Sequence, residues 1–216
     1  MRSSLSFRPQ VESLGDRVVP SITLAGGVLS VEGTASADVI DVRMTDSTHL
    51  QVSIDKTGES QTFDLTADTI NRLSILGRAG NDTIRVGADV AISADISGNR
   101  GHDFIQGGGG DDVIHGNRGS DSINGRGGND RLFGDEGNDS IVGGRGDDLI
   151  RAGIGDDVVN GGVGDDKLFG DDGNDVLLGA SGDDSIHGGE GSNSLDGGTG
   201  SDDLHDGLDD HSMPDG

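Results

Sequence analysis

An aspartate recurs at every ninth residue through the second half of this chain. Residues 98–205 divide into twelve blocks of nine, and the sixth place is Asp in eleven of them, with Asn193 as the exception. These aspartates are Asp103, Asp112, Asp121, Asp130, Asp139, Asp148, Asp157, Asp166, Asp175, Asp184 and Asp202. Carboxylates held in a regular row repel one another unless a cation lies between them. The spacing therefore favours binding of hard cations, which prefer carboxylate and carbonyl oxygens.

Three other places in the block are almost invariant. Position 4 is glycine and position 8 is Ile, Leu or Val in all twelve blocks, and position 1 is glycine except at Ala152. A low-complexity tract of glycine and acidic residues is the alternative interpretation. Such a tract would not keep a single aliphatic residue in phase twelve times, so the block is a structural repeat.

The repeat predicts a coiled chain with two sheets. We expect positions 7–9 to form a short strand that turns the position-8 side chain to one face. Positions 1–6 then reverse the chain, and glycine supplies the positive φ angles that this requires. Two repeats make one coil, so odd repeats stack in one sheet and even repeats in the other. Ile105, Ile123 and Ile141 should face Ile114, Leu132 and Ile150 across a thin core.

The pattern GGxGxDxUx, where U is aliphatic, resembles that of the RTX (hemolysin-type) calcium-binding nonapeptide-repeat proteins. The resemblance covers half of the chain. It implies an all-β fold, a right-handed parallel β-roll or β-helix solenoid, with Ca²⁺ between the stacked turns.

The resemblance also implies a ligand set. Carbonyls of positions 2 and 4 and the Asp of one repeat would join carbonyls of positions 1 and 3 and the Asp two repeats on. One such site would use Gly108, Gly110 and Asp112 with Gly125, Gly127 and Asp130, and another Gly144, Gly146 and Asp148 with Gly161, Val163 and Asp166. The predicted metal residues are the eleven aspartates and the position-4 glycines Gly101, Gly110, Gly119, Gly128, Gly137, Gly146, Gly155, Gly164, Gly173 and Gly182. Five gaps on each side predict up to about ten calcium ions, with a weaker site at Asn193.

Calcium is also expected to act as a folding partner. One buried aliphatic side chain per nine residues is too little to offset the entropy of ordering the backbone. We therefore expect a disordered or molten chain without calcium and a folded chain with it.

The remaining segments differ from the repeats in composition and pattern. Residues 1–21 are predicted to be a flexible leader, 22–97 a β-rich extension or cap, and 206–216 an acidic tail. The cap contains alternating runs such as DVIDVR and RLSIL, and its segments 33–41 and 77–85 keep the nonapeptide phase. A separate small β domain is the alternative for 22–97. Residues 6–21 resemble an N-terminal motif of some large bacterial surface proteins.

Composition excludes several function classes. The formal net charge is −25, of which residues 98–216 carry −20 (27 acidic against 7 basic side chains). This charge argues against nucleic acids and anionic membranes as partners. There is no cysteine, which excludes disulfides and thiolate metal sites. No run approaches the roughly 18 apolar residues of a membrane span, and the N-terminus lacks the apolar core of a secretory signal.

Sequence motifs do not indicate an enzyme. HExxH, GxSxG and GxxxxGK[ST] do not occur, and the six histidines are scattered. The predicted function is calcium binding by a secreted or cell-surface structural or interaction module, with an extracellular or cell-surface location. An accessory or remnant calcium-binding module of an exported enzyme or adhesin is the alternative.

Outward positions 7 and 9 suggest a contact surface. Arg131, Phe133, Leu149, Arg151, Lys167 and Phe169 should cluster on one sheet, and Val142, Val158, Val176 and Leu178 on the other. Self-association or a surface partner is one interpretation of these clusters, and an ordinary solvated surface is the other.

Overall fold

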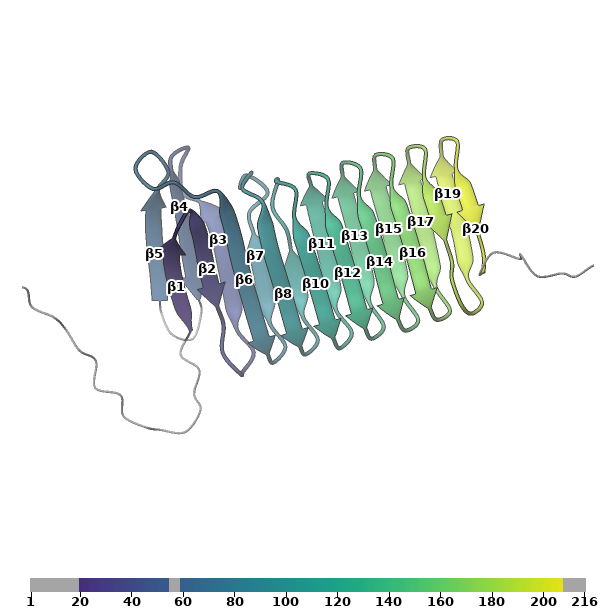
Figure 1. The fold of residues 1–216 in the computed structure, drawn as a ribbon, viewed down its shortest axis with the longest axis horizontal. Helices are drawn as coiled ribbons and strands as arrows, with labels where there is room; N and C mark the ends of the chain where they lie inside the picture. Colours follow the sequence, from purple (N-terminus) through teal and green to yellow (C-terminus); the bar gives the residue numbers. More distant parts are fainter. Residues whose placement is uncertain (1–19, 55–58, 208–216) are drawn as a thin grey trace, which may run out of the picture.

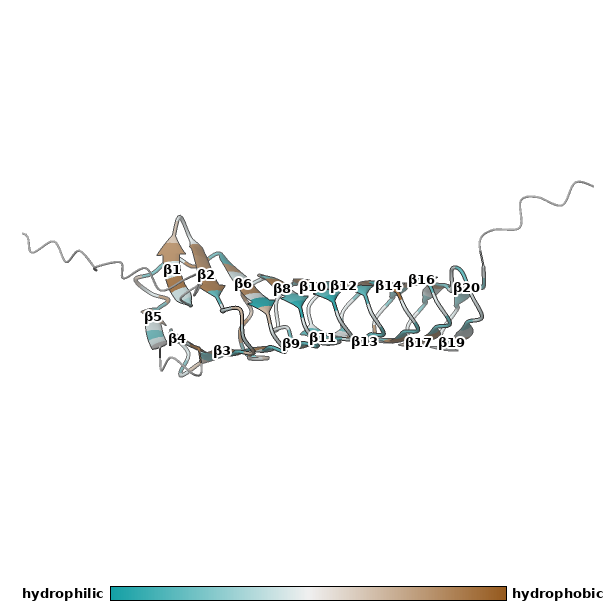
Figure 2. Ribbon diagram, turned by 90° about the horizontal axis from the view of Figure 1, so that it is seen from below, coloured by the Kyte–Doolittle hydropathy of each residue, from teal (hydrophilic) through white to brown (hydrophobic). Residues whose placement is uncertain are grey.

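The chain folds into two long, facing β-sheets that form an elongated coil (Figure 1). The computed structural model describes residues 20–54 and 59–207, so the predicted leader lies almost wholly outside the described residues. Each sheet has ten strands, and Figure 2 shows the sheets as two separate layers. The prediction of an all-β parallel roll with a β-rich N-terminal cap is confirmed. The described segments include no helix of the length and hydropathy that crossing a membrane requires.

We call the two sheets A and B. The strands of sheet A, in spatial order, are β1 (Ser21–Ala25), β2 (Val28–Glu32), β6 (Arg72–Ala79), β8 (Ala94–Arg100), β10 (Val113–Arg118), β12 (Arg131–Glu136), β14 (Leu149–Ile154), β16 (Lys167–Asp172), β18 (Ser185–His187) and β20 (Asp203–His205). The strands of sheet B are β5 (Glu59–Asp64), β4 (His49–Ile54), β3 (Val39–Met44), β7 (Thr83–Val86), β9 (Phe104–Gln106), β11 (Ser122–Gly127), β13 (Ser140–Arg145), β15 (Val158–Val163), β17 (Val176–Ser181) and β19 (Ser194–Thr199).

Strand pairing has the predicted period of two repeats. Within the roll each strand pairs in parallel with the strand eighteen residues away, as in the register Ile114↔Leu132 and Leu132↔Ile150. Odd and even repeats therefore separate into sheets B and A. Antiparallel pairs occur only at the N-terminal end of the described chain, where β1 pairs with β2 and β4 pairs with β3 and β5.

The strands are longer than predicted. Most roll strands have six residues and run from position 7 of one repeat to position 3 of the next, so only positions 4–6 form the turn. The prediction of a six-residue reversal was wrong because positions 2 and 3 also pair across coils, as Asn117 does with Asp135. The position-1 glycine, which lies between positions 9 and 2 of the same strand, is buried and allows the backbone to approach the neighbouring coil closely.

Position 8 supplies the core of the roll. These side chains are 2% exposed or less from Ile105 to Ile186, while positions 7 and 9 face outward. The cap carries a denser core, since sixteen of the twenty-seven buried hydrophobic residues in the described chain lie between Ile22 and Ile96. The cap and the roll share both sheets without a break.

Alanine should destabilise the folded protein much more at position 4 of the turn than at the neighbouring position 3. Gly119 has φ of +119°, and a Cβ added there would lie 1.7 Å from the Gly101 carbonyl oxygen. Gly119→Ala should therefore destabilise the calcium-loaded protein by at least about 1–3 kcal/mol, the strain of such a backbone alone. Urea unfolding monitored by circular dichroism measures the change.

Gly127→Ala is the matched control. Gly127 occupies position 3, has no positive φ, and its added Cβ would have its nearest neighbour at 4.0 Å. We expect its free energy of unfolding to change by no more than about 0.5 kcal/mol. Equal destabilisation by the two variants would contradict the assignment of the sharp turn to position 4.

Candidate metal sites in the turns

The position-6 aspartates form two buried ladders, one along each row of turns. Within a ladder, the backbone N–H of one Asp donates to Oδ1 of the Asp in the next coil, at 2.7 Å from Asp103 to Asp121 and 2.8 Å from Asp130 to Asp148. The odd ladder consists of Asp38, Asp82, Asp103, Asp121, Asp139, Asp157, Asp175 and Asn193. The even ladder consists of Asp112, Asp130, Asp148, Asp166, Asp184 and Asp202. Both ladders arise because position 6 recurs at the same place in every coil.

The second carboxylate oxygen has no hydrogen-bond partner at nine rungs of the roll, five in the odd ladder and four in the even ladder. These buried Oδ2 atoms belong to Asp103, Asp121, Asp130, Asp139, Asp148, Asp157, Asp166, Asp175 and Asp184. Each of these side chains is 3% exposed or less. An unpaired buried polar atom is costly and rare in a native fold, so a regular row of them fits oxygens that bind a cation.

The position-1 glycines open a small space beside these oxygens. A Cβ added to Gly125 would lie 2.2 Å from Asp130 Oδ2 and 2.8 Å from the carbonyl oxygen of Gly143. At Gly143 the corresponding distances are 2.3 Å to Asp148 Oδ2 and 2.4 Å to the Gly161 carbonyl oxygen. A carboxylate of one coil and a carbonyl of the next thus face the same space, which is the chemistry of a Ca²⁺ site.

The other predicted carbonyl ligands differ in availability. Carbonyl oxygens of positions 2 and 4 point along the stack, since Arg126 O lies 2.3 Å from an added Cβ at Gly144 and Gly101 O lies 1.7 Å from one at Gly119. Position-3 carbonyls already accept hydrogen bonds, as Val163 O does from Gly146 N at 2.9 Å. The position-2 carbonyl of Asp171 likewise accepts from Glu190 N at 2.7 Å. The structure therefore brings positions 1, 2, 4 and 6 together and leaves the carbonyls of positions 2 and 3 partly satisfied.

Side chains alone do not complete a metal site. No group of three or more His, Cys, Asp or Glu side chains is arranged to hold a metal within residues 20–54 and 59–207. Each gap is the space between two successive rungs of one ladder, so only two ladder carboxylates flank it. A cation between turns would take its remaining ligands from backbone carbonyls.

Burial changes the protonation of the metal-free ladder. Desolvation, with smaller contributions from neighbouring aspartates, raises the pKa of Asp121, Asp130, Asp157 and Asp166 to about 7. It raises the pKa of Asp112, Asp139 and Asp148 to about 6, although backbone hydrogen bonds act in the opposite direction. The pKa values of Asp103, Asp175 and Asp184 are also raised, mainly by burial. A divalent cation favours the ionised form and would reverse this effect.

In the first aspartate of each ladder, the second carboxylate oxygen accepts hydrogen bonds from the protein. Oδ2 of Asp38 accepts from the backbone N–H of Thr34 at 2.6 Å and from its hydroxyl at 2.9 Å. Oδ2 of Asp112, the first rung of the even ladder, accepts from Gly108 N at 2.8 Å. Protein donors thus take the place of a cation at the N-terminal end of both ladders.

The odd ladder ends differently at Asn193. Its amide oxygen accepts from Asp175 N at 2.9 Å, while its Nδ2 donates to Asp206 at 3.1 Å. That Nδ2 would lie 2.6 Å from an added Cβ at Gly188, so a donor faces the space that holds an oxygen elsewhere. The weaker site predicted at Asn193 has this geometry.

A second ladder at position 5 was missed by the sequence reasoning. Here the backbone N–H of each residue donates to the side chain one coil earlier, as from Asp147 to Asn129 at 3.1 Å and from Asp165 to Asp147 at 3.0 Å. The odd turns show the same contact from Asp156 to Asn138 at 3.1 Å. These side chains are exposed. The signal was present, because position 5 is Asp, Asn, Ser or His in all twelve repeats, and each of these side chains is a short acceptor.

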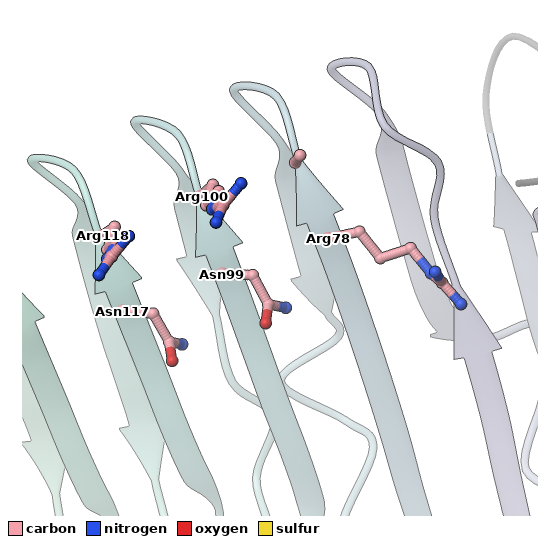
Figure 3. A pocket seen from close by; sticks show the side chains of 6 residues that line it. Arg78, Asn99, Arg100, Asn117 and Arg118 are labelled. Atoms are coloured by element: carbon pink, nitrogen blue, oxygen red, sulfur yellow. The ribbon is translucent and has the colours of Figure 1, made fainter. Parts of the chain in front are cut away.

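Two surface pockets lie along the turns, and they differ in charge. One, of 530 Å³, is lined by Arg78, Asn99, Arg100, Asn117 and Arg118 on β6, β8 and β10 (Figure 3). Its three guanidinium groups exclude it as a cation site. The other, of 440 Å³, follows the even turns and is lined by ladder residues of positions 5 and 6, among them Asp130 and Asp148.

Comparison with known protein families identifies the repeat. The model of the RTX calcium-binding nonapeptide repeat matches residues 74–90, 97–132, 106–141, 133–168 and 169–204. No curated protein matches the chain. The matches cover more than half of the chain and include the segment around Asp82, which the sequence analysis had assigned to the cap. This chain, with its stacked parallel coils and aspartate ladders, belongs to the family of RTX calcium-binding nonapeptide-repeat proteins.

Proposed function

We propose that this protein is a secreted or cell-surface structural module whose roll folds when Ca²⁺ enters the turns. The observation that carries the proposal is the row of buried Oδ2 atoms without a hydrogen-bond partner. Ca²⁺ accepts six to eight oxygens in flexible geometry, whereas Mg²⁺ demands a tighter octahedron. Carboxylates and carbonyls that converge from two coils suit the larger ion.

The ladder aspartates and the turn carbonyls would hold the ions. Position 6 would contribute Oδ2, and positions 1, 2 and 4 would contribute carbonyls, including those of the position-4 glycines. Each ion would neutralise the repulsion between neighbouring rungs and join one coil to the next. The rung Asp82 extends the odd ladder into the cap, so a site between Asp82 and Asp103 belongs to the same series.

An extracellular role follows from this coupling. Modules that work outside cells bind Ca²⁺ with dissociation constants of roughly 10⁻⁴–10⁻³ M. Sites in that range would stay empty at low calcium, and the acidic roll would remain unfolded until it met calcium-rich surroundings. The absence of a catalytic motif fits a structural or interaction role for the folded roll.

The cap should fold without calcium. It has the denser hydrophobic core, its first ladder carboxylate is satisfied by Thr34, and its hairpins pair strands that are close in sequence. Local pairing of this kind forms readily. This limits calcium-dependent folding to the roll rather than the whole chain.

Hydrogen exchange measured by mass spectrometry can separate these two parts. With excess EGTA, we expect amides of the cap strands β2, β3 and β6 to stay protected and amides of β10–β19 to exchange as in an unfolded chain. With millimolar Ca²⁺, both parts should be protected, because ions between the turns offset the charge repulsion. Full protection of the roll in EGTA would refute calcium-coupled folding.

Substitution at adjacent positions tests the assignment of ligands. Asp148 is 2% exposed with an unpaired Oδ2, whereas the neighbouring Asp147 is exposed and accepts from Asp165 N. Asp148→Asn should remove ions from the two gaps that Asp148 borders, since an amide gives up one carboxylate oxygen and its charge. Calorimetric titration would show a lower stoichiometry, and thermal unfolding in calcium a lower midpoint.

Asp147→Asn is the control with the same change of charge. Asn keeps the acceptor oxygen that Asp165 N needs, so calcium stoichiometry should equal that of the wild type. If Asp147→Asn loses as many ions as Asp148→Asn, position 6 is not the specific ligand.

The raised pKa values predict opposite effects of acid on the metal-free and calcium-bound roll. Free aspartate has a pKa of about 3.9, so between roughly pH 4 and 7 the folded metal-free roll binds more protons than the unfolded chain. Stability of the metal-free roll should therefore fall as pH rises through this window. Calcium affinity should instead fall as pH drops, because protons compete with Ca²⁺ for the ladder.

Titration calorimetry at several pH values, in buffers of different ionisation enthalpy, measures both affinity and released protons. Because the metal-free roll is expected to be unfolded at neutral pH, with aspartates at their free pKa of about 3.9, we expect proton release on Ca²⁺ binding below roughly pH 5 and almost none near pH 8. Release near pH 6 would show instead that the metal-free roll is folded there with a protonated ladder. An affinity that does not change across this range would contradict ligation by the buried aspartates.

A further inference from the structure

Apart from Arg145 at the end of β13, the middle of the outer surface of sheet B carries no charged side chain. The outward residues of β13, β15 and β17 occupy positions 7 and 9 of odd repeats and position 2 of even repeats, and we call this set the neutral face. Its larger members are Val142, Val158, Val176 and Leu178, and the others are Ser, Asn, Gly and Ala. Val158 and Val176 are 52% and 47% exposed.

The repeat does not require this lack of charge. On the opposite sheet, the outward residues of β12, β14 and β16 include Arg131, Arg151, Lys167, Asp135 and Asp171. The turn edges carry the exposed acids of position 5. In a chain with a net charge of −25, the neutral face is thus a distinct surface.

The neutral face is also flat. Its position-2 residues are Gly144, Gly162 and Ala180, so this row has almost no side chain. The exposed side chains Arg145, Val163 and Ser181 follow at position 3, at the turn end of each strand. The remaining outward residues are mostly β-branched or short. Two sheets of this kind can pack face to face at a separation of about 10 Å.

We propose that the neutral face binds the neutral face of a second copy of this chain. Two strongly acidic molecules repel each other, and they can approach closely only where neither presents a carboxylate. The ends of the face favour a copy turned end for end. Arg126 lies on β11 and Asp196 on β19, each two strands from β15. In that arrangement β15 packs over β15, and each Arg126 end lies over an Asp196 end.

This symmetry is isologous, so each residue on the axis meets its own counterpart. Asn160 lies in the middle of β15 on the outer side of the sheet, half-buried and with its Oδ1 buried and without a hydrogen-bond partner, and the symmetry places it opposite Asn160 of the second copy. Arg126 donates hydrogen bonds to Gln106 Oε1 at 2.7 Å and to Val86 O at 3.0 Å, so its charge is held over β9 and β7, beyond the end of the neutral face.

The size of the face limits the strength of the contact. Three six-residue strands span roughly 20 Å by 14 Å, which is less than the roughly 800 Å² per partner of a standard interface. The dimer should therefore be weak and depend on protein concentration. Added salt should strengthen it by screening the acidic margins.

Analytical ultracentrifugation of the full chain in millimolar Ca²⁺ tests the proposal. The wild type should show a monomer–dimer equilibrium. Asn160→Asp changes almost no volume but sets two carboxylates against each other at the axis. It should raise the dimer dissociation constant by about tenfold or more, since like charges juxtaposed across an interface are strongly unfavourable.

Asn129→Asp is the matched control, because it adds the same charge at an exposed position-5 site away from the neutral face. It should leave the dissociation constant close to that of the wild type. Val158→Ser, which removes apolar surface without adding charge, should weaken the dimer as well. Circular dichroism in calcium verifies that each variant is folded.

Three results would overturn the proposal. They are a wild type that stays monomeric at every concentration and salt level, a dimer that Asn160→Asp leaves intact, and equal weakening by Asn160→Asp and Asn129→Asp.

Discussion

Mutual repulsion of buried carboxylates is the constraint on which this fold depends. The position-6 aspartates stack because each Oδ1 accepts a backbone N–H from the neighbouring coil, so the contact that holds the coils together also aligns the charges. Burial then raises the pKa of each carboxyl, and Oδ2 remains without a hydrogen-bond partner. Such a row is stable only when protons or cations neutralise it. Because the roll buries one aliphatic side chain per repeat, its hydrophobic core cannot compensate for ionised and unneutralised ladders.

The side chains at positions 5 and 6 hydrogen-bond to neighbouring coils on opposite sides. The position-6 side chain accepts from the preceding coil, while the position-5 side chain accepts from the following one. Each turn is therefore tied to both neighbours. Position 5 needs only one acceptor, so Asn and Ser are sufficient there. The proposed calcium sites require a second oxygen at position 6, and Asp, which supplies one, occupies eleven of the twelve repeats.

The period of nine predicted most of the roll, because each fixed residue type answers one local requirement. Position 8 gave the core, position 4 supplied the positive φ expected of glycine, and the two-repeat coil placed Ile114 beside Leu132. The positive φ at position 2, held by non-glycine residues such as Asn117 and Arg126, was not predicted. The strand limits were wrong because glycine at position 1 suggests a turn, whereas here it permits a buried close approach within a strand. The direction of hydrogen bonds at position 5 depends on how turns stack, which periodicity alone does not specify. The contact between Thr34 and Asp38 was missed because the first ladder turn departs from the repeat, with Ser36 at the place of the position-4 glycine.

The distribution of core and ladder contacts also makes the two ends of the roll unequal in stability. In a stack of repeats, each coil is stabilised by its own contacts and by those of its neighbours. At the N-terminal end, the cap offers a dense core and a ladder rung already satisfied by Thr34. At the other end of the described chain, Leu195 is only partly buried and Leu204 is 41% exposed, and the odd ladder ends in an amide at Asn193. Coils next to the cap thus receive a preformed template, whereas in the proposed calcium-coupled folding the last coils would depend on the ions bound before them. Folding should therefore propagate from the cap, with each bound ion completing the edge on which the next coil is built.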